Sequence, residues 1–78
     1  MPLFYFDVFD NSKADPLDHD GMDLPDMSDA CQEALKTLSE MARDLSYKGS
    51  QELAILVREA DGSRSLRVAL SLTVDKVQ

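Results

Sequence analysis

The strongest constraint on this chain is a change of hydrophobic period between its middle and its end. Between residues 27 and 45, apolar side chains recur every three or four positions, which is the spacing of one face of an α-helix. The residues on this stripe are Met27, Ala30, Cys31, Ala34, Leu35, Leu38, Met41, Ala42 and Leu45. Two alternating runs follow, joined at Asp61-Gly62, a pair that favours the positive φ angles of a tight hairpin turn. The sequence therefore predicts a helix over residues 27–46 and hairpin strands over 52–59 and 65–75.

The chain before this helix predicts one strand and a long acidic loop. Residues 3–9 are rich in aromatic and branched side chains and alternate in character, which is typical of a strand. Residues 10–26 combine Asn, Ser, Pro and Gly with many aspartates, which is turn chemistry. A short strand over residues 22–24 could return beside the first strand.

The predicted helix also has recognisable ends. The carboxylate of Asp26 can accept the free amides of the first turn, with Ser28 as the alternative cap. Gly49 is of the residue type that commonly follows the last turn of a helix.

The order of these elements predicts one α+β domain over residues 1–78. A three- to four-stranded, mostly antiparallel sheet would carry the amphipathic helix on one face, in the order β-(β)-α-β-β. Residues 65–75 form the longest and most regular alternating run, so we expect them at the centre of the sheet. The first and third strands would then be parallel, and the helix would be a right-handed crossover between them.

The small size of the chain favours self-association. A chain of 78 residues buries only about 60% of its unfolded surface, so such chains usually need a disulfide, a metal or a partner subunit. The single cysteine excludes an intramolecular disulfide, and one cysteine with one histidine cannot complete a usual four-ligand zinc site. We therefore expect a homodimer.

The charge and hydropathy of the chain exclude several classes of partner. Fifteen acidic and eight basic side chains give a net charge of −7, which repels nucleic-acid phosphates and anionic membrane surfaces. No segment approaches the roughly twenty apolar residues of a membrane span, and the first residues do not look like a signal peptide. The unpaired cysteine fits a reducing compartment. We expect a cytoplasmic protein that binds neither nucleic acid nor membrane.

The face of the sheet away from the helix is a candidate interface. Its apolar residues are Leu3, Tyr5, Phe9, Leu56 and Ala69. An uncovered face with this apolar content is a candidate surface for dimerisation. Pairing through the exposed edge of the first or third strand is the alternative.

The acidic loop is the clearest candidate for cation binding. Asp18, Asp20 and Asp23 surround Gly21 and could bind a divalent cation weakly. The calcium-binding EF-hand pattern fails, because its twelfth position, which requires a bidentate Glu, would be Met27. Aspartates are also frequent in solvated turns, where they bond their own backbone. We therefore expect no metal site.

Cys31 and His19 are the remaining candidates for chemistry, as a nucleophile and its base. Cys31 lies on the apolar stripe of the helix, where a free cysteine usually acts as a small hydrophobic residue. The sequence places no basic side chain to activate the thiol, and nearby aspartates would oppose the thiolate. We expect no catalytic residue, no cofactor and no enzymatic activity.

Short motifs along the whole chain carry a family resemblance. They are Phe4-Tyr5-Phe6-Asp7-Val8, Asp18-His19-Asp20-Gly21, Leu24-Pro25-Asp26, Glu33-Ala34-Leu35, Ala42-Arg43-Asp44, Glu52-Leu53-Ala54-Ile55, Asp61-Gly62 and Val68-Ala69-Leu70-Ser71-Leu72-Thr73-Val74. In these motifs the chain resembles a family of short bacterial proteins, common in rhizobia and related alphaproteobacteria, that is known only as a domain of unknown function. The resemblance implies a compact bacterial domain and no established activity.

A looser likeness is to the partly ribonuclease-H-like antitoxin of the HicA/HicB toxin–antitoxin pair. That family also runs from strands through an aspartate-containing loop into an amphipathic helix and a further strand. This chain lacks the Pro-Gly-Cys step and the appended DNA-binding segment of that family. The sequence favours a non-catalytic protein-interaction or regulatory module, with a HicB-like antitoxin partner and a weak cation-binding protein as alternatives.

Overall fold

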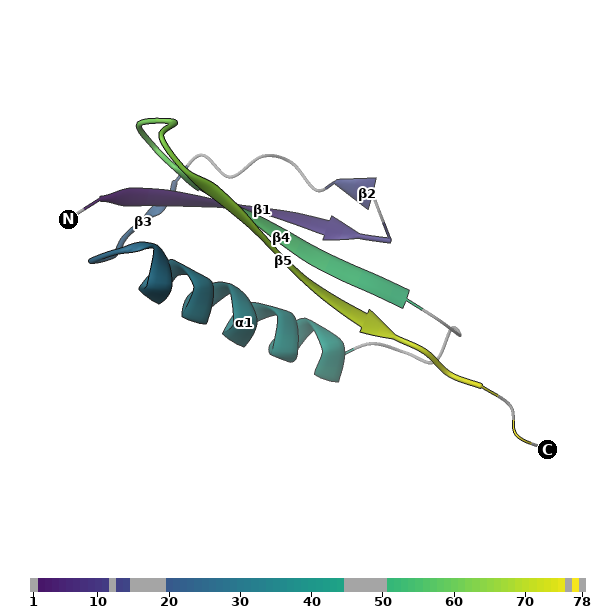
Figure 1. The fold of residues 1–78 in the computed structure, drawn as a ribbon. Helices are drawn as coiled ribbons and strands as arrows, with labels where there is room; N and C mark the ends of the chain where they lie inside the picture. Colours follow the sequence, from purple (N-terminus) through teal and green to yellow (C-terminus); the bar gives the residue numbers. More distant parts are fainter. Residues whose placement is uncertain (1, 12, 15–19, 45–50, 76, 78) are drawn as a thin grey trace.

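An antiparallel sheet with one helix across one of its faces forms the described part of the chain (Figure 1). The computed structural model describes residues 2–11, 13–14, 20–44, 51–75 and 77. The elements in chain order are β1 (Leu3–Asp10), β2 (Lys13–Ala14), β3 (Met22–Asp23), α1 (Met27–Arg43), β4 (Gln51–Glu59) and β5 (Ser65–Leu72). The predicted α+β fold, with one helix on a mostly antiparallel sheet, is confirmed.

β4, and not the last strand, lies at the centre of the sheet. It pairs antiparallel with β1 on one side and with β5 on the other. The expectation that residues 65–75 lie centrally, with parallel first and third strands and a crossover helix, is wrong. The continuous apolar run 53–57 in β4 is typical of a strand buried on both faces. The regular alternation of β5 instead reflects one face in contact with solvent.

Two short strands pair with the outer edge of β1. β2 pairs with its last two residues and β3 with its first two. β3 covers two of the three residues predicted for a short strand, whereas β2 was not predicted. Asn11, which follows β1, has a positive φ of 51° and exchanges backbone and side-chain hydrogen bonds of 2.7 Å with the main chain of Glu52. These bonds fix the end of β1 against β4.

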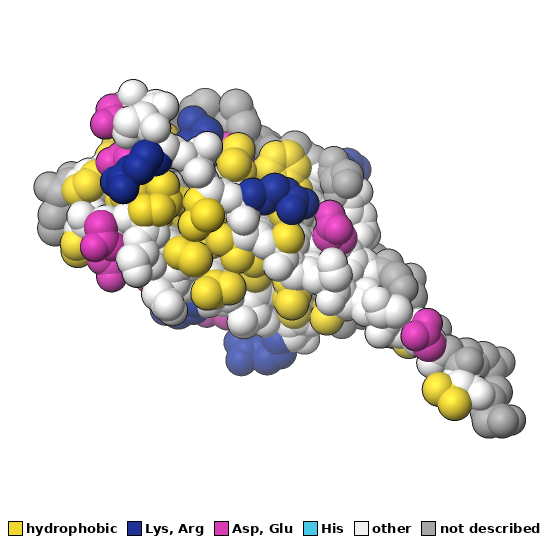
Figure 2. Space-filling model, viewed as in Figure 1, with side chains coloured by type: hydrophobic (Ala, Val, Ile, Leu, Met, Phe, Trp, Pro, Cys, Tyr) yellow, Lys and Arg dark blue, Asp and Glu magenta, His cyan; other side chains and the backbone are white. Residues whose placement is uncertain are grey.

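The core lies between α1 and the sheet. Its buried apolar residues are Phe4, Ala30, Ala34, Leu38, Leu53, Ile55 and Val57. The helix contributes small residues at positions 30 and 34, which allow it to lie close to the sheet, and it contacts β4 and β5. Figure 2 shows hydrophobic side chains between β5 and α1 on the side where β5 lies in front. The core is therefore covered less completely at this edge of the sheet.

The helix begins as predicted and ends earlier than predicted. Asp26 is the N-cap, and its carboxylate accepts the amide of Asp29 at 3.1 Å. The last helical residue is Arg43, and the N–H of Asp44 turns back to the carbonyl of Met41. The expected end near Gly49 lies outside the described residues. No helix among the described residues is both long enough and apolar enough to cross a lipid bilayer.

Candidate functional site

The sheet face opposite α1, here called the open face, carries the candidate site. Side chains alternate along each strand, so the register decides which of them share this face. Tyr5 lies beside Arg58, and Phe9 lies beside Ala54, which in turn lies beside Ala69. The open face therefore combines residues from three adjacent strands that are far apart in the sequence.

All five residues predicted for an interface belong to the open face. Leu3, Tyr5, Phe9 and Leu56 are half-buried, and Ala69 is exposed. Phe9 and Leu56 line a common pocket, whereas Leu3 lies at the start of β1, opposite Asp23 of β3. Ion pairs lie between these apolar groups, which the sequence alone did not indicate.

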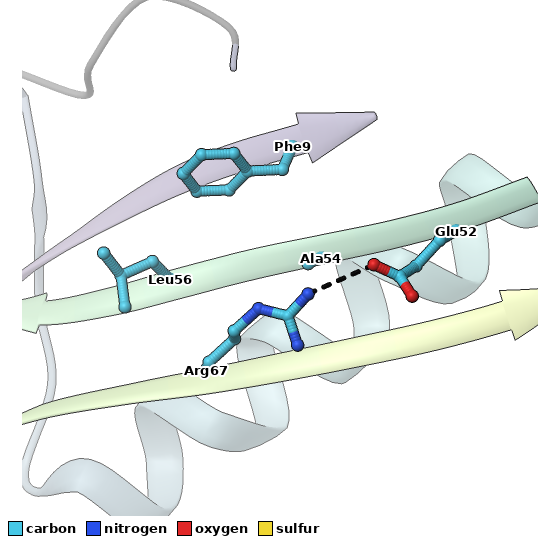
Figure 3. A pocket seen from close by; sticks show the side chains of 5 residues that line it. All are labelled: Phe9, Glu52, Ala54, Leu56 and Arg67. Carbon is cyan, nitrogen blue, oxygen red and sulfur yellow. Dashed lines mark hydrogen bonds and ion pairs between the residues drawn. The ribbon is translucent and has the colours of Figure 1, made fainter. Parts of the chain in front are cut away.

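The pocket is a hollow of about 310 Å³ on this face. Figure 3 shows the ring of Phe9 on β1 and the side chain of Leu56 on β4, with Ala54 between them and the pair Glu52–Arg67. Ala54 is only 2% exposed and forms the floor. Arg67 Nη2 lies 3.3 Å from Glu52 Oε1, and both side chains are at least half exposed. The pocket thus has apolar walls and an ion pair at its rim.

Asp7 and Arg58 form the second feature of the open face. Arg58 donates from Nε and Nη2 to the two carboxylate oxygens of Asp7 at 2.6 and 3.1 Å. The Asp7 side chain is 3% exposed, and the guanidinium carbon of Arg58 lies 5.0 Å from the centre of the Tyr5 ring. Because Arg58 engages both carboxylate oxygens, Asp7 acts as a structural anion between β1 and β4.

The tip of the β4–β5 hairpin holds a third set of charges. Glu59 accepts from Arg64 Nε and from Ser63 Oγ, each at 2.9 Å. These hydrogen bonds, that of Arg64 first, lower the pKa of the Glu59 carboxyl below its usual value, although burial opposes the shift. Hydrogen bonds from Ser63 likewise lower the pKa of Asp61. The tip is therefore built around ionised carboxylates.

The structure describes only some of the residues that the sequence offered as candidates for cation binding and catalysis. Asp20 and Asp23 are exposed, and Cys31 is half-buried on α1. Asp18 and His19 lie outside the described residues. Within the described ranges, His, Cys, Asp and Glu do not form any group of three that could hold a metal ion. Gly21 has a structural role, because its φ is +73° and a Cβ there would lie 2.8 Å from Leu3 Cδ1.

A protein family matches most of the chain. The family described as Domain of unknown function (DUF6894) matches residues 3–71, from the first residue of β1 into the end of β5. No curated protein and no solved structure matches the chain significantly. The family match therefore includes the helix and every strand described above except the last residue of β5, and the chain belongs to the DUF6894 family.

Proposed function

We propose that this chain is a non-catalytic protein-interaction module whose open face receives an apolar side chain of a partner protein. The observation that carries the proposal is the pocket of about 310 Å³ lined by Phe9, Glu52, Ala54, Leu56 and Arg67. An apolar centre with a polar, solvent-accessible rim is the usual anatomy of a protein–protein interface.

The shape of the pocket favours a protein over a small molecule. Sites for small ligands are clefts that bury most of the ligand surface. Here, all five lining residues come from one face of three adjacent strands, so the pocket has a floor and sides but no opposite wall. A small ligand would stay exposed on its outer side. A partner protein could close the pocket with its own surface.

The rim can adapt to a partner at low cost. The Glu52–Arg67 pair is exposed, and exposed ion pairs typically contribute less than about 1 kcal/mol. Either side chain could therefore exchange its present contact for a polar group of the partner. Arg58, in contrast, is held by Asp7 and provides a fixed boundary to the face.

The wider setting is part of the same proposal. We place the module in the bacterial cytoplasm, where the unpaired Cys31 would remain reduced. The net charge of −7 disfavours nucleic acid and anionic membranes as partners. The thin core of a 78-residue chain supports a homodimer as the working form.

Site-specific photocrosslinking tests the open face. Benzoylphenylalanine in place of Glu52, at the rim, should give a defined heterologous adduct in the producing cells. The same residue in place of Lys36, on the exposed side of α1, should not give that adduct. With the partner identified and purified, Leu56→Asp should weaken binding at least about 10-fold, because a carboxylate would have to enter an apolar contact.

Two results would remove the open face as the docking site. One is the same set of adducts from positions 52 and 36. The other is unchanged affinity of the purified partner for Leu56→Asp, in a variant whose far-UV circular dichroism shows the native fold.

A further inference from the structure

One edge of β5 is open in the part of the chain that the structure describes. β5 pairs with β4 on one side, and none of the described strands lies beside it on the other. An edge strand presents a row of N–H and C=O groups that another strand can bind. Proteins usually protect such edges with lysine, proline or a bulge. Residues 65–74 contain neither lysine nor proline and hold one arginine, so this edge is chemically suited to pairing.

The side chains of β5 that face α1 are covered incompletely. On β4, Leu53, Ile55 and Val57 are at most 1% exposed, whereas Val68 and Leu70, their neighbours on β5, are only half-buried. Figure 2 shows hydrophobic side chains at the surface between β5 and α1. A further strand along this edge would extend the layer that covers them.

The alternation of β5 continues beyond the sheet. β4 begins at Gln51, which pairs with Leu72, so residues 73–75 extend past the end of β4. Val74 has the same phase as Leu72 and is 49% exposed. The predicted strand over 65–75 ends at Leu72 in the structure, where the described pairing with β4 ends at Gln51. A strand from elsewhere could complete the pattern.

We propose that this strand is β5 of a second copy, paired antiparallel about a two-fold axis at Ser71. The proposal rests on the homodimer included in the proposed function and identifies its contact. In this register the facing pairs are Arg67 with Asp75, Val68 with Val74, Ala69 with Thr73, and Leu70 with Leu72. In each pair, the two side chains point to the same face of the sheet. The face that packs on α1 and the open face therefore both continue across the dimer.

The charges select this register. Arg67 and Asp75 are four residues on either side of Ser71, so each copy places its arginine beside the aspartate of the other. Opposite charges directly across two strands attract, and like charges repel. A two-fold axis at Arg67 would place the arginines of the two copies opposite each other. An axis at Leu70 would place Arg67 of one copy opposite Thr73 of the other. A shift by a single residue would bring apolar side chains to the open face.

A second copy is a better occupant than an unrelated strand because the segment complements itself. Arg67 and Val68 lie on one side of Ser71, and Val74 and Asp75 lie at the matching positions on the other side. When a second copy runs antiparallel, Arg67 therefore faces Asp75 and Val68 faces Val74. The Arg67–Glu52 pair is exposed and weak, so Arg67 is able to turn toward the second copy. The contact uses the edge of the sheet. Of the five residues that line the pocket, only Arg67 takes part in it.

Sedimentation equilibrium of three purified proteins tests the contact. The wild type should have twice the chain mass of 8.7 kDa. Val74→Asp should raise the dimer dissociation constant at least about 10-fold, because it places a carboxylate in the apolar row of the contact. Met22→Asp is the matched control: Met22 is 43% exposed and lies on β3, at the opposite edge of the sheet. It should leave the dissociation constant unchanged.

A charge exchange tests the register. Arg67→Asp and Asp75→Arg should each weaken the homodimer of that variant. In such a homodimer, both of the pairs between positions 67 and 75 would join two like charges. Mixed together, the two variants should form a heterodimer, visible by native mass spectrometry, in which both pairs have opposite signs again. Both positions are exposed, so the fold should persist in circular dichroism.

The outcomes separate this inference from the proposed function. A wild-type monomer at all concentrations would overturn the contact, as would a dimer that Leu56→Asp dissociates and Val74→Asp does not. Failure of the mixed variants to form a heterodimer would overturn the register. Crosslinking from position 52 on β4 is read independently, and its failure would leave the edge contact standing while removing the open-face docking site.

Discussion

Gly21 and Gly62 have nearly the same backbone conformation in different surroundings. Their φ angles are +73° and +76°. A Cβ at Gly62 would meet nothing within 4 Å, whereas at Gly21 it would lie 2.8 Å from Leu3 Cδ1 and 3.1 Å from the carbonyl oxygen of Phe4. The two positions therefore separate the cost of the left-handed conformation from the cost of crowding.

We predict different losses of stability for alanine at these two glycines. Gly62→Ala should lower the free energy of unfolding by about 1 kcal/mol, the cost of a left-handed conformation for a residue with a Cβ. Gly21→Ala should cost about 1–3 kcal/mol more, because Leu3 and the β1 main chain must also move. Urea unfolding of both variants measures the difference. Equal losses would show that β3 yields to the added methyl group without strain.

Asp7 shows how far a single residue can be interpreted from sequence. Its alternation with Tyr5 and Phe9 places it on the open face, and the structure agrees. Its pairing with Arg58 requires β1 to lie next to β4, and the predicted strand order separated these strands. The alternation of residues along a strand shows which face of the sheet a side chain points to. The neighbours of that side chain on the face depend on the order of the strands, which is a property of the whole sheet.

At the scale of elements, the periodic patterns in the sequence correctly predicted which segments form the helix and the main strands. They were less reliable for the ends of these elements and for the order of the strands in the sheet. The helical stripe predicted α1 and its buried residues Ala30, Ala34 and Leu38, and Asp26 predicted its cap. The regular alternation of residues 65–75 was interpreted as a sign of a central strand. A central strand is covered on both faces, so the uninterrupted run of β4 was the better signal. The pocket could not be predicted, because it depends on that order.

The β4–β5 hairpin should be an acid-labile element. The pKa values of Glu59 and Asp61 are lowered from their ordinary values of 4.5 and 3.8 by hydrogen bonds at the tip. The folded chain therefore holds these protons less tightly than the unfolded chain does. Their contribution to stability is present above the unfolded-state pKa values and is lost as the pH falls through the lower folded-state values.

Urea unfolding between pH 7 and pH 3 tests this behaviour with Glu59→Gln as the comparison. The variant should be less stable than the wild type at pH 7, and its stability should fall less steeply below pH 4.5. Asp29 acts in the opposite direction, because burial and the charge of Asp26 raise its pKa. Parallel curves for wild type and variant would show that Glu59 carries no net pH dependence.

At the scale of the whole molecule, the sheet has three surfaces with different surroundings. One face packs on α1 and supplies the core. The open face holds the pocket and is anchored by the Asp7–Arg58 pair. At the exposed edge of β5, a further strand would extend both of these faces. Pairing at that edge would enlarge the sheet without occupying the open face, so the dimer contact and partner binding are geometrically compatible.

This arrangement predicts a melting temperature that depends on protein concentration. Since only the folded chain can pair through β5, a higher concentration favours the folded dimer by mass action. For a dimer of two 78-residue chains, each tenfold increase should raise the wild-type melting temperature by about 4 °C. Differential scanning calorimetry over a hundredfold range measures this slope. Met22→Asp should retain the slope and Val74→Asp should lose it. A flat wild-type curve would mean that the layer between α1 and the sheet holds one chain folded without a second copy.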